Sequence, residues 1–88
     1  MSIAPRLPDT TTLRQLAELP PGWHAVDNLA WEAGGDDLEA RRVVRRTAED
    51  LWKLGYLDRM FAYVHARPQA LYLLDNRLAD LAAEAVAS

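Results

Sequence analysis

The longest amphipathic pattern in the chain runs from Asp36 to Leu54 and is followed by Gly55. At about 100° per residue, one broad arc of this segment is suited to face a core and the opposite arc is charged. The core-facing arc comprises Ala40, Val43, Val44, Thr47, Ala48, Leu51, Trp52 and Leu54. The pattern predicts a long helix, with Asp36 or Asp37 as its N-cap and Gly55 as the residue that ends it.

The N-terminal part of the chain predicts an arm and a short helix. Residues 1–9 contain two prolines and no periodic pattern, so we expect a flexible N-terminal arm. A narrow apolar stripe predicts a helix over residues 11–19, capped by Asp9 or Thr10. Pro20-Pro21-Gly22 ends this helix.

Two short elements are predicted before the long helix. Residues 23–26 alternate only in part, which leaves open a brief strand or an extended link. A second short helix is expected over residues 28–33, with Asp27 as its cap, and Gly34-Gly35 forms the turn that follows.

After Gly55 the pattern changes from a helical to a strand-like period. Residues 56–64 and 70–74 are apolar and rich in strand-favouring side chains, and residues 65–69 between them predict a turn of about five residues. This pattern is typical of a β-hairpin. A terminal helix is expected over residues 76–86, capped by Asp75 or Asn76.

Charge is unevenly distributed along the 88 residues. The formal net charge is −3, yet residues 41–67 hold seven basic and three acidic side chains. Local charge of this kind determines where an anionic partner docks, although exposed helix charges are commonly just solvated. Cysteine is absent, and neither a secretory signal nor a membrane-spanning run is recognisable. We therefore expect a cytoplasmic protein with no membrane partner.

Enzymatic and metal-binding motifs are not apparent. His24 and His65 lack the spacing of metal ligands, so we expect no metal site and no cofactor. Asp36, Asp37 and Glu39 are better explained by helix capping than by cation binding. No nucleophile or phosphate-binding motif is present, and the protein is not expected to be an enzyme.

The order of predicted elements is helix, short strand, helix, turn, helix, hairpin and helix. Together with Leu29-Ala30, Gly34-Gly35 and Leu51-Trp52-Lys53-Leu54-Gly55-Tyr56-Leu57-Asp58-Arg59, this order resembles the winged helix-turn-helix family. The resemblance implies a mainly α fold with a small β-hairpin, in which a three-helix core carries a wing and a C-terminal helix. The expected domain spans residues 10–75, and residues 76–88 form the added helix.

The resemblance implies a small DNA-binding transcriptional regulator of bacterial or phage type. Its third helix would enter the major groove of double-stranded DNA, and its hairpin would serve as the wing. Helical geometry places Arg42 and Arg46 farthest outward, with Arg41 and Arg45 at the core edge near Trp52. The expected DNA-binding residues are Arg41, Arg42, Arg45, Arg46, Lys53, Arg59 and Arg67.

Other functions of the same surfaces stay open. A winged-helix protein-interaction module or inhibitor would use the arginine face against an acidic protein and would not bind DNA. The terminal helix either covers the hairpin and first helix or mediates a homodimer. We expect at least two of the three tryptophans, Trp23, Trp31 and Trp52, to belong to the core or an interface rather than to stack on bases.

Overall fold

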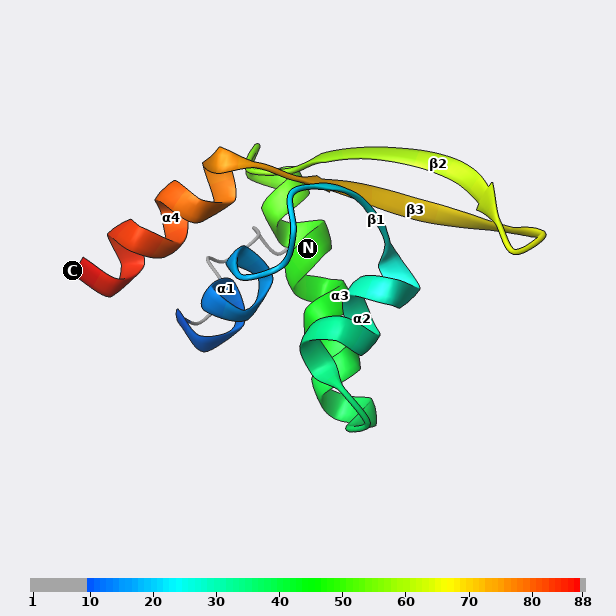
Figure 1. Ribbon diagram of the computed structural model, residues 1–88, viewed down its shortest axis with the longest axis horizontal. Helices are drawn as coiled ribbons and strands as arrows, with labels where there is room; N and C mark the ends of the chain where they lie inside the picture. The colour runs from blue at the N-terminus through cyan, green and yellow to red at the C-terminus, as the bar shows by residue number, and fades with distance from the viewer. Residues whose placement is uncertain (1–9, 88) are drawn as a thin grey trace, which may run out of the picture.

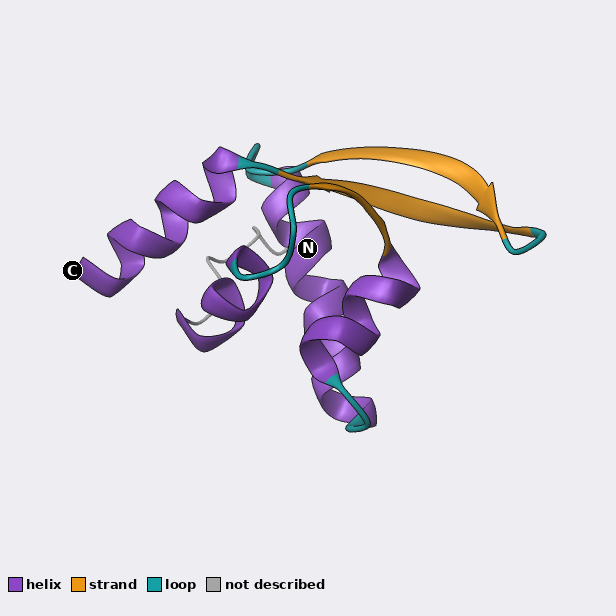
Figure 2. Cartoon of the chain, viewed as in Figure 1, coloured by secondary structure: helices purple, strands orange, loops and turns teal. Residues whose placement is uncertain are grey.

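The protein consists of a sheet along one side and helices beneath it (Figure 1). The computed structural model describes residues 10–87, so the predicted arm over residues 1–9 lies outside the described residues. Figure 2 shows the same view with helices and strands in separate colours. The element order is α1 (Thr10–Ala17), β1 (Gly22–Ala25), α2 (Val26–Gly34), α3 (Leu38–Lys53), β2 (Asp58–Val64), β3 (Arg67–Leu74) and α4 (Asn76–Ala87).

The described strands form one antiparallel sheet in the order β1-β3-β2. β1 pairs with the second half of β3, from Gly22 opposite Leu74 to Ala25 opposite Leu71. The expectation of a mainly α fold is wrong, because the structure is 57% helix and 25% strand and is therefore mixed α/β. Over residues 23–26 the sequence left open a strand or an extended link, because so short a segment shows no clear alternation of apolar and polar side chains. Pairing with β3 makes β1 a strand.

The hydrophobic core lies between the sheet and the helices. In α3 the buried side chains are Val44, Thr47, Ala48 and Leu51. Val43 and Leu54 are each 38% exposed, so the buried arc is narrower than predicted. The core cluster draws on every helix and on β3; its members are Leu13, Leu16, Leu29, Val44, Ala48, Leu51, Leu57, Tyr72, Leu74, Leu78, Leu81 and Ala82.

Both ends of α3 use the residues predicted for them. The side chain of Asp37 accepts a hydrogen bond from the backbone N–H two residues on, at 2.9 Å, and so caps the helix. Gly55 has a φ of 93°, a conformation that side chains disfavour. The N–H groups of Gly55 and Tyr56 donate to the carbonyls of Trp52 and Leu51, which satisfies the last turn. The chain therefore leaves α3 in a fixed direction toward β2.

Helices α2 and α3 approach each other closely at Gly34. A Cβ at this position would lie 2.8 Å from the backbone nitrogen of Arg41, which is too short for a side chain. The expected cap of α2 is wrong, because the helix begins at Val26 and Asp27 lies within its first turn. Asp27 instead accepts a hydrogen bond from Arg45 of α3 at 3.0 Å. This contact joins the two helices.

The hairpin turn is shorter than the five residues predicted. β2 and β3 stay paired as far as Val64 and Arg67, which leaves a turn of His65 and Ala66. Both turn residues have positive φ, 53° and 62°. Pro68 is accommodated in β3 because β1 pairs only with the other end of that strand.

Helix α4 packs against α1. Leu78, Leu81 and Ala82 form its buried side. Asp75 is the side chain that caps α4, accepting a hydrogen bond from the N–H of Arg77 at 3.0 Å. The position of α4 is therefore set by core packing and by this cap.

Candidate nucleic-acid interface

The solvent-facing side of α3 carries a row of charged side chains. Arg42, Arg46, Glu49 and Lys53 are three or four residues apart and all are exposed. The buried residues of α3 lie on the opposite side of the helix. Because that side is anchored in the core, the helix presents this row to solvent in a fixed orientation.

Two basic side chains of the row have carboxylate partners on α3. Arg42 Nη1 lies 3.8 Å from Glu39 Oε2, and Lys53 Nζ lies 3.4 Å from Glu49 Oε1. Such exposed pairs contribute about 0–1 kcal/mol, so a phosphate can replace either carboxylate at little cost. Among the described residues, no carboxylate lies within ion-pair distance of Arg46. Arg46 is thus the most available cation of the row.

Arg41 and Arg45 lie against α2. The guanidinium carbon of Arg41 is 4.1 Å from the centre of the Trp31 ring, and Arg45 binds Asp27. The sequence predicted that both lie at the core edge of α3, and the structure adds their partners, an aromatic ring and a carboxylate of α2.

Arg59 connects the end of α3 to the hairpin. Its guanidinium carbon lies 3.4 Å from the centre of the Trp52 ring and 5.0 Å from that of Phe61. A planar guanidinium stacks well on aromatic faces and keeps its charge while doing so. Trp52, Arg59 and Phe61 therefore form a stacked series that leads from α3 onto β2.

The far part of the hairpin projects beyond the helices (Figure 1). Phe61 is 68% exposed and Tyr63 is 80% exposed. Arg67 is also exposed and directly follows the two-residue turn. The hairpin therefore exposes a basic residue beside its turn and, on β2, two aromatic side chains that the core does not cover.

The tryptophans differ from one another in burial. Trp52 packs against the core cluster, as expected. Trp23 and Trp31 are 44% and 53% exposed, so Trp52 is the tryptophan that belongs to the core, and an interface role of the other two stays a prediction. Trp31 nevertheless has a structural contact through Arg41.

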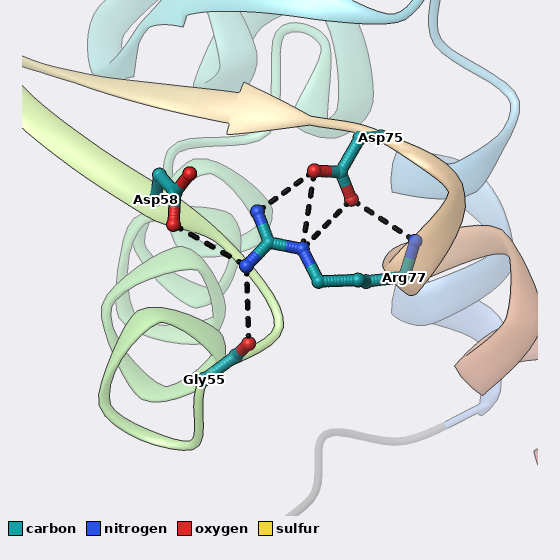
Figure 3. A network of polar contacts seen from close by, with 4 residues as sticks. All are labelled: Gly55, Asp58, Asp75 and Arg77. Carbon is teal, nitrogen blue, oxygen red and sulfur yellow. Dashed lines mark hydrogen bonds and ion pairs between the residues drawn. The ribbon is translucent and has the colours of Figure 1, made fainter.

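Arg77 holds the base of the hairpin (Figure 3). Its Nε and Nη2 donate to the carboxylate of Asp75, with the shortest contact 2.7 Å. Its Nη1 donates to the Gly55 carbonyl and to Asp58 Oδ1, each at 3.3 Å. Hydrogen bonding from Arg77 lowers the pKa of Asp75, and hydrogen bonds to Asp75 and Asp58 raise the pKa of Arg77. The ends of α3, β2 and β3 are thereby joined.

Arg77 is absent from the predicted site residues, although one signal for it exists. A cation in the first turn of a helix opposes the helix dipole, and this disfavoured position calls for a carboxylate partner. Asp75 is near in sequence, but nothing local indicates that Asp58 completes the network. Asp58 is paired with Arg77 at the base of the hairpin, so its negative charge is offset where the hairpin begins.

The described residues offer few other candidate sites. Within residues 10–87, no group of three histidine or acidic side chains could hold a metal ion, and no helix is long and apolar enough to cross a membrane. A cavity of about 150 Å³ between α1 and the start of α4 is lined mainly by apolar side chains. Its one carboxylate, Asp75, is already bound to Arg77.

Comparison of the chain with protein-family models, curated proteins and solved structures finds no match. Function must therefore be inferred from the geometry and charge of the chain itself.

Proposed function

We propose that this protein is a small transcriptional regulator of winged helix-turn-helix type that binds double-stranded DNA. In this proposal α3 lies in the major groove and the β2–β3 hairpin is the wing. The order α1-β1-α2-α3-β2-β3, the sheet order β1-β3-β2 and the close approach of α2 to α3 support such an arrangement.

The observation that carries the proposal is the exposed basic row of α3. Arg42 and Arg46 extend from a helix whose other side is fixed in the core. Arginine forms forked hydrogen bonds with guanine edges and with phosphates, and the major groove is wide enough for a helix. Asp36, Asp37 and Glu39 would repel phosphate near the first turn. The central turns of α3 are therefore proposed to make the closest contacts.

The hairpin adds a second basic surface. Between Arg59 and Leu74 the sequence contains two arginines and no carboxylate. Arg67 lies beside the tip, and Arg59 lies near the end of α3. These positions suit contacts with phosphates on either side of the groove that α3 occupies.

Duplex binding measured across a series of salt concentrations tests the proposal. The slope of log affinity against log salt concentration is negative, and each neutralised phosphate adds about 0.9 to its magnitude. R42A/R46A should therefore reduce that magnitude by about 2. The R14A variant is the control, because Arg14 is an exposed arginine on α1, which packs mainly against α4. An equal slope for wild type and R42A/R46A would contradict the proposal.

A protein-interaction module is the second candidate function, and the outer face of the sheet favours it. Trp23 and Met60 are 44% and 42% exposed there, next to half-buried Leu71 and Leu73. In Figure 1 the helices lie beneath the opposite face of the sheet. Recovery of a stoichiometric protein partner that is lost in W23A, with no duplex binding by the wild type, would favour this function.

A further inference from the structure

We propose that the hairpin carries a stacking site for unpaired nucleobases, formed by Phe61 and Tyr63. The protein would then prefer duplex DNA next to a single-stranded segment over continuous duplex. This inference rests on the proposed DNA binding and specifies the kind of DNA that the hairpin recognises.

The strand register places the two rings on the same face of the hairpin. Directly opposite residues of an antiparallel pair lie on one face. Phe61 is opposite Ala70 and Tyr63 is opposite Pro68. Tyr72, two residues beyond Ala70 in β3, is buried in the core on that same face. We call this the inner face of the hairpin; the helices cover it at the base and leave it open toward the tip.

The spacing of the rings fits a nucleobase. Two residues along a strand span about 7 Å. Bases in stacked DNA follow each other about every 3.4 Å, so a base between two parallel rings needs about twice that separation. Phe61 and Tyr63 are the two most exposed of the large apolar or aromatic side chains in the described residues. Their positions allow one base to enter between them, with Arg59 on the other side of Phe61.

The charges around the rings favour nucleic acid over protein as the occupant. Arg59 stacks between Trp52 and Phe61 at one end of the inner face. Arg67 follows the turn and pairs with Val64, so the register places it on the outer face, but residues 59–74 contain no carboxylate that would repel phosphate. Exposed aromatic rings beside a cation are the combination that binds single-stranded nucleic acid, through base stacking and phosphate attraction together.

The outer face of the hairpin differs and provides a control. Met60 points to the outer face of the same strand, opposite Leu71, and is 42% exposed. No arginine stacks on it in the described residues. Replacing Met60 therefore removes exposed apolar surface from β2 without altering the inner face.

The test uses three labelled DNA probes: a blunt duplex, the same duplex with a single-stranded tail, and the tail alone. Stacking of a base on an aromatic ring contributes enough affinity that wild type should bind the tailed duplex about tenfold more tightly than the blunt one. F61A/Y63A should abolish this preference, and Y63A, which keeps the contact of Phe61 with Arg59, should weaken it and leave blunt-duplex binding within about twofold. Y63F keeps a ring and should keep the preference, as should M60A.

Several outcomes would overturn the inference. Equal wild-type affinity for blunt and tailed duplex would overturn it while leaving the proposed function intact, provided that binding still depends on Arg42 and Arg46. An equal loss of preference in M60A and F61A/Y63A would show that the inner face has no particular role. Absence of binding to all three probes would overturn both proposals. Capture of a protein that requires Phe61 and Tyr63, without probe binding, would assign the rings to a protein partner instead.

Discussion

The base and the tip of the β2–β3 hairpin differ in what supports them. At the base, Tyr72 and Leu74 are buried against the helices, and Arg77 joins β2, β3 and α3. Toward the tip, Phe61 and Tyr63 are exposed, and strand pairing with a two-residue turn maintains the structure. The difference separates two roles: side chains at the base fix the direction of the hairpin, whereas those near the tip are available for binding.

The largest expected difference in the free energy of unfolding is between a variant of a core residue and a variant of a residue near the tip of the hairpin. Leu51 is fully buried, so L51A should lower the free energy of unfolding by about 2–5 kcal/mol through lost burial and a residual cavity. Y63A should change it by less than about 0.5 kcal/mol, because Tyr63 is 80% exposed. Urea unfolding of both variants measures this contrast. Comparable losses would show that the tip is part of the cooperative core.

An added methyl group at Gly34 should have the next largest effect. The Cβ of G34A would meet the backbone of Arg41 at 2.8 Å, which α2 and α3 can relieve only by moving apart. We expect a loss of about 1–3 kcal/mol in unfolding free energy. G55A is the matched comparison: its Cβ meets no atom within 4 Å, and the left-handed backbone alone should cost about 1 kcal/mol. A smaller loss in G34A than in G55A would contradict the close-packing interpretation.

The smallest expected effect on stability concerns the ionic contacts of Arg77 at the base of the hairpin. Because hydrogen bonding from Arg77 lowers the folded-state pKa of Asp75 below its ordinary value of 3.8, the contact stabilises the protein above that pH. This stabilisation is lost as the pH falls through the lowered pKa. Unfolding by urea at about pH 7 and about pH 3 should therefore show a smaller acid-induced loss in R77A than in wild type.

The R14A variant controls for removal of one arginine, and we expect its acid-induced loss to equal that of wild type. If R77A and wild type lose the same stability on acidification, the contact with Asp75 contributes nothing measurable to folding. The effect is expected to be small because exposed ion pairs are well solvated.

Local signals account for the parts of the fold that the sequence predicts. The bounds of α3 follow from a strong helical period together with Asp37 and Gly55, whose roles depend on their immediate neighbours. The hairpin turn is different, because His65-Ala66 lacks the asparagine or glycine that usually marks a two-residue turn. Its length therefore could not be predicted from the turn residues and becomes visible only in the pairing of the two strands.

The candidate site residues likewise divide into those whose positions follow from local sequence and those whose contacts depend on tertiary structure. The outward position of Arg42 and Arg46 follows from helical spacing, and both are exposed. The partners of Arg41 and Arg45 could not be predicted because they belong to α2, whose packing along α3 depends on tertiary structure. Arg59 was predicted only as a DNA-binding residue. Its stacking on Trp52 could not be predicted, because it depends on how β2 approaches the end of α3.

The left-handed turn at His65 and Ala66 has a consequence for the chemistry of the hairpin. A two-residue connection leaves no slack for β2 to slide along β3, so the alignment of the strands is locked at the tip. A slip by one residue would move Phe61 and Tyr63 to the outer face and bring Met60, Ala62 and Val64 inward. The turn thus selects an aromatic rather than an aliphatic surface for display, although neither of its residues belongs to that surface.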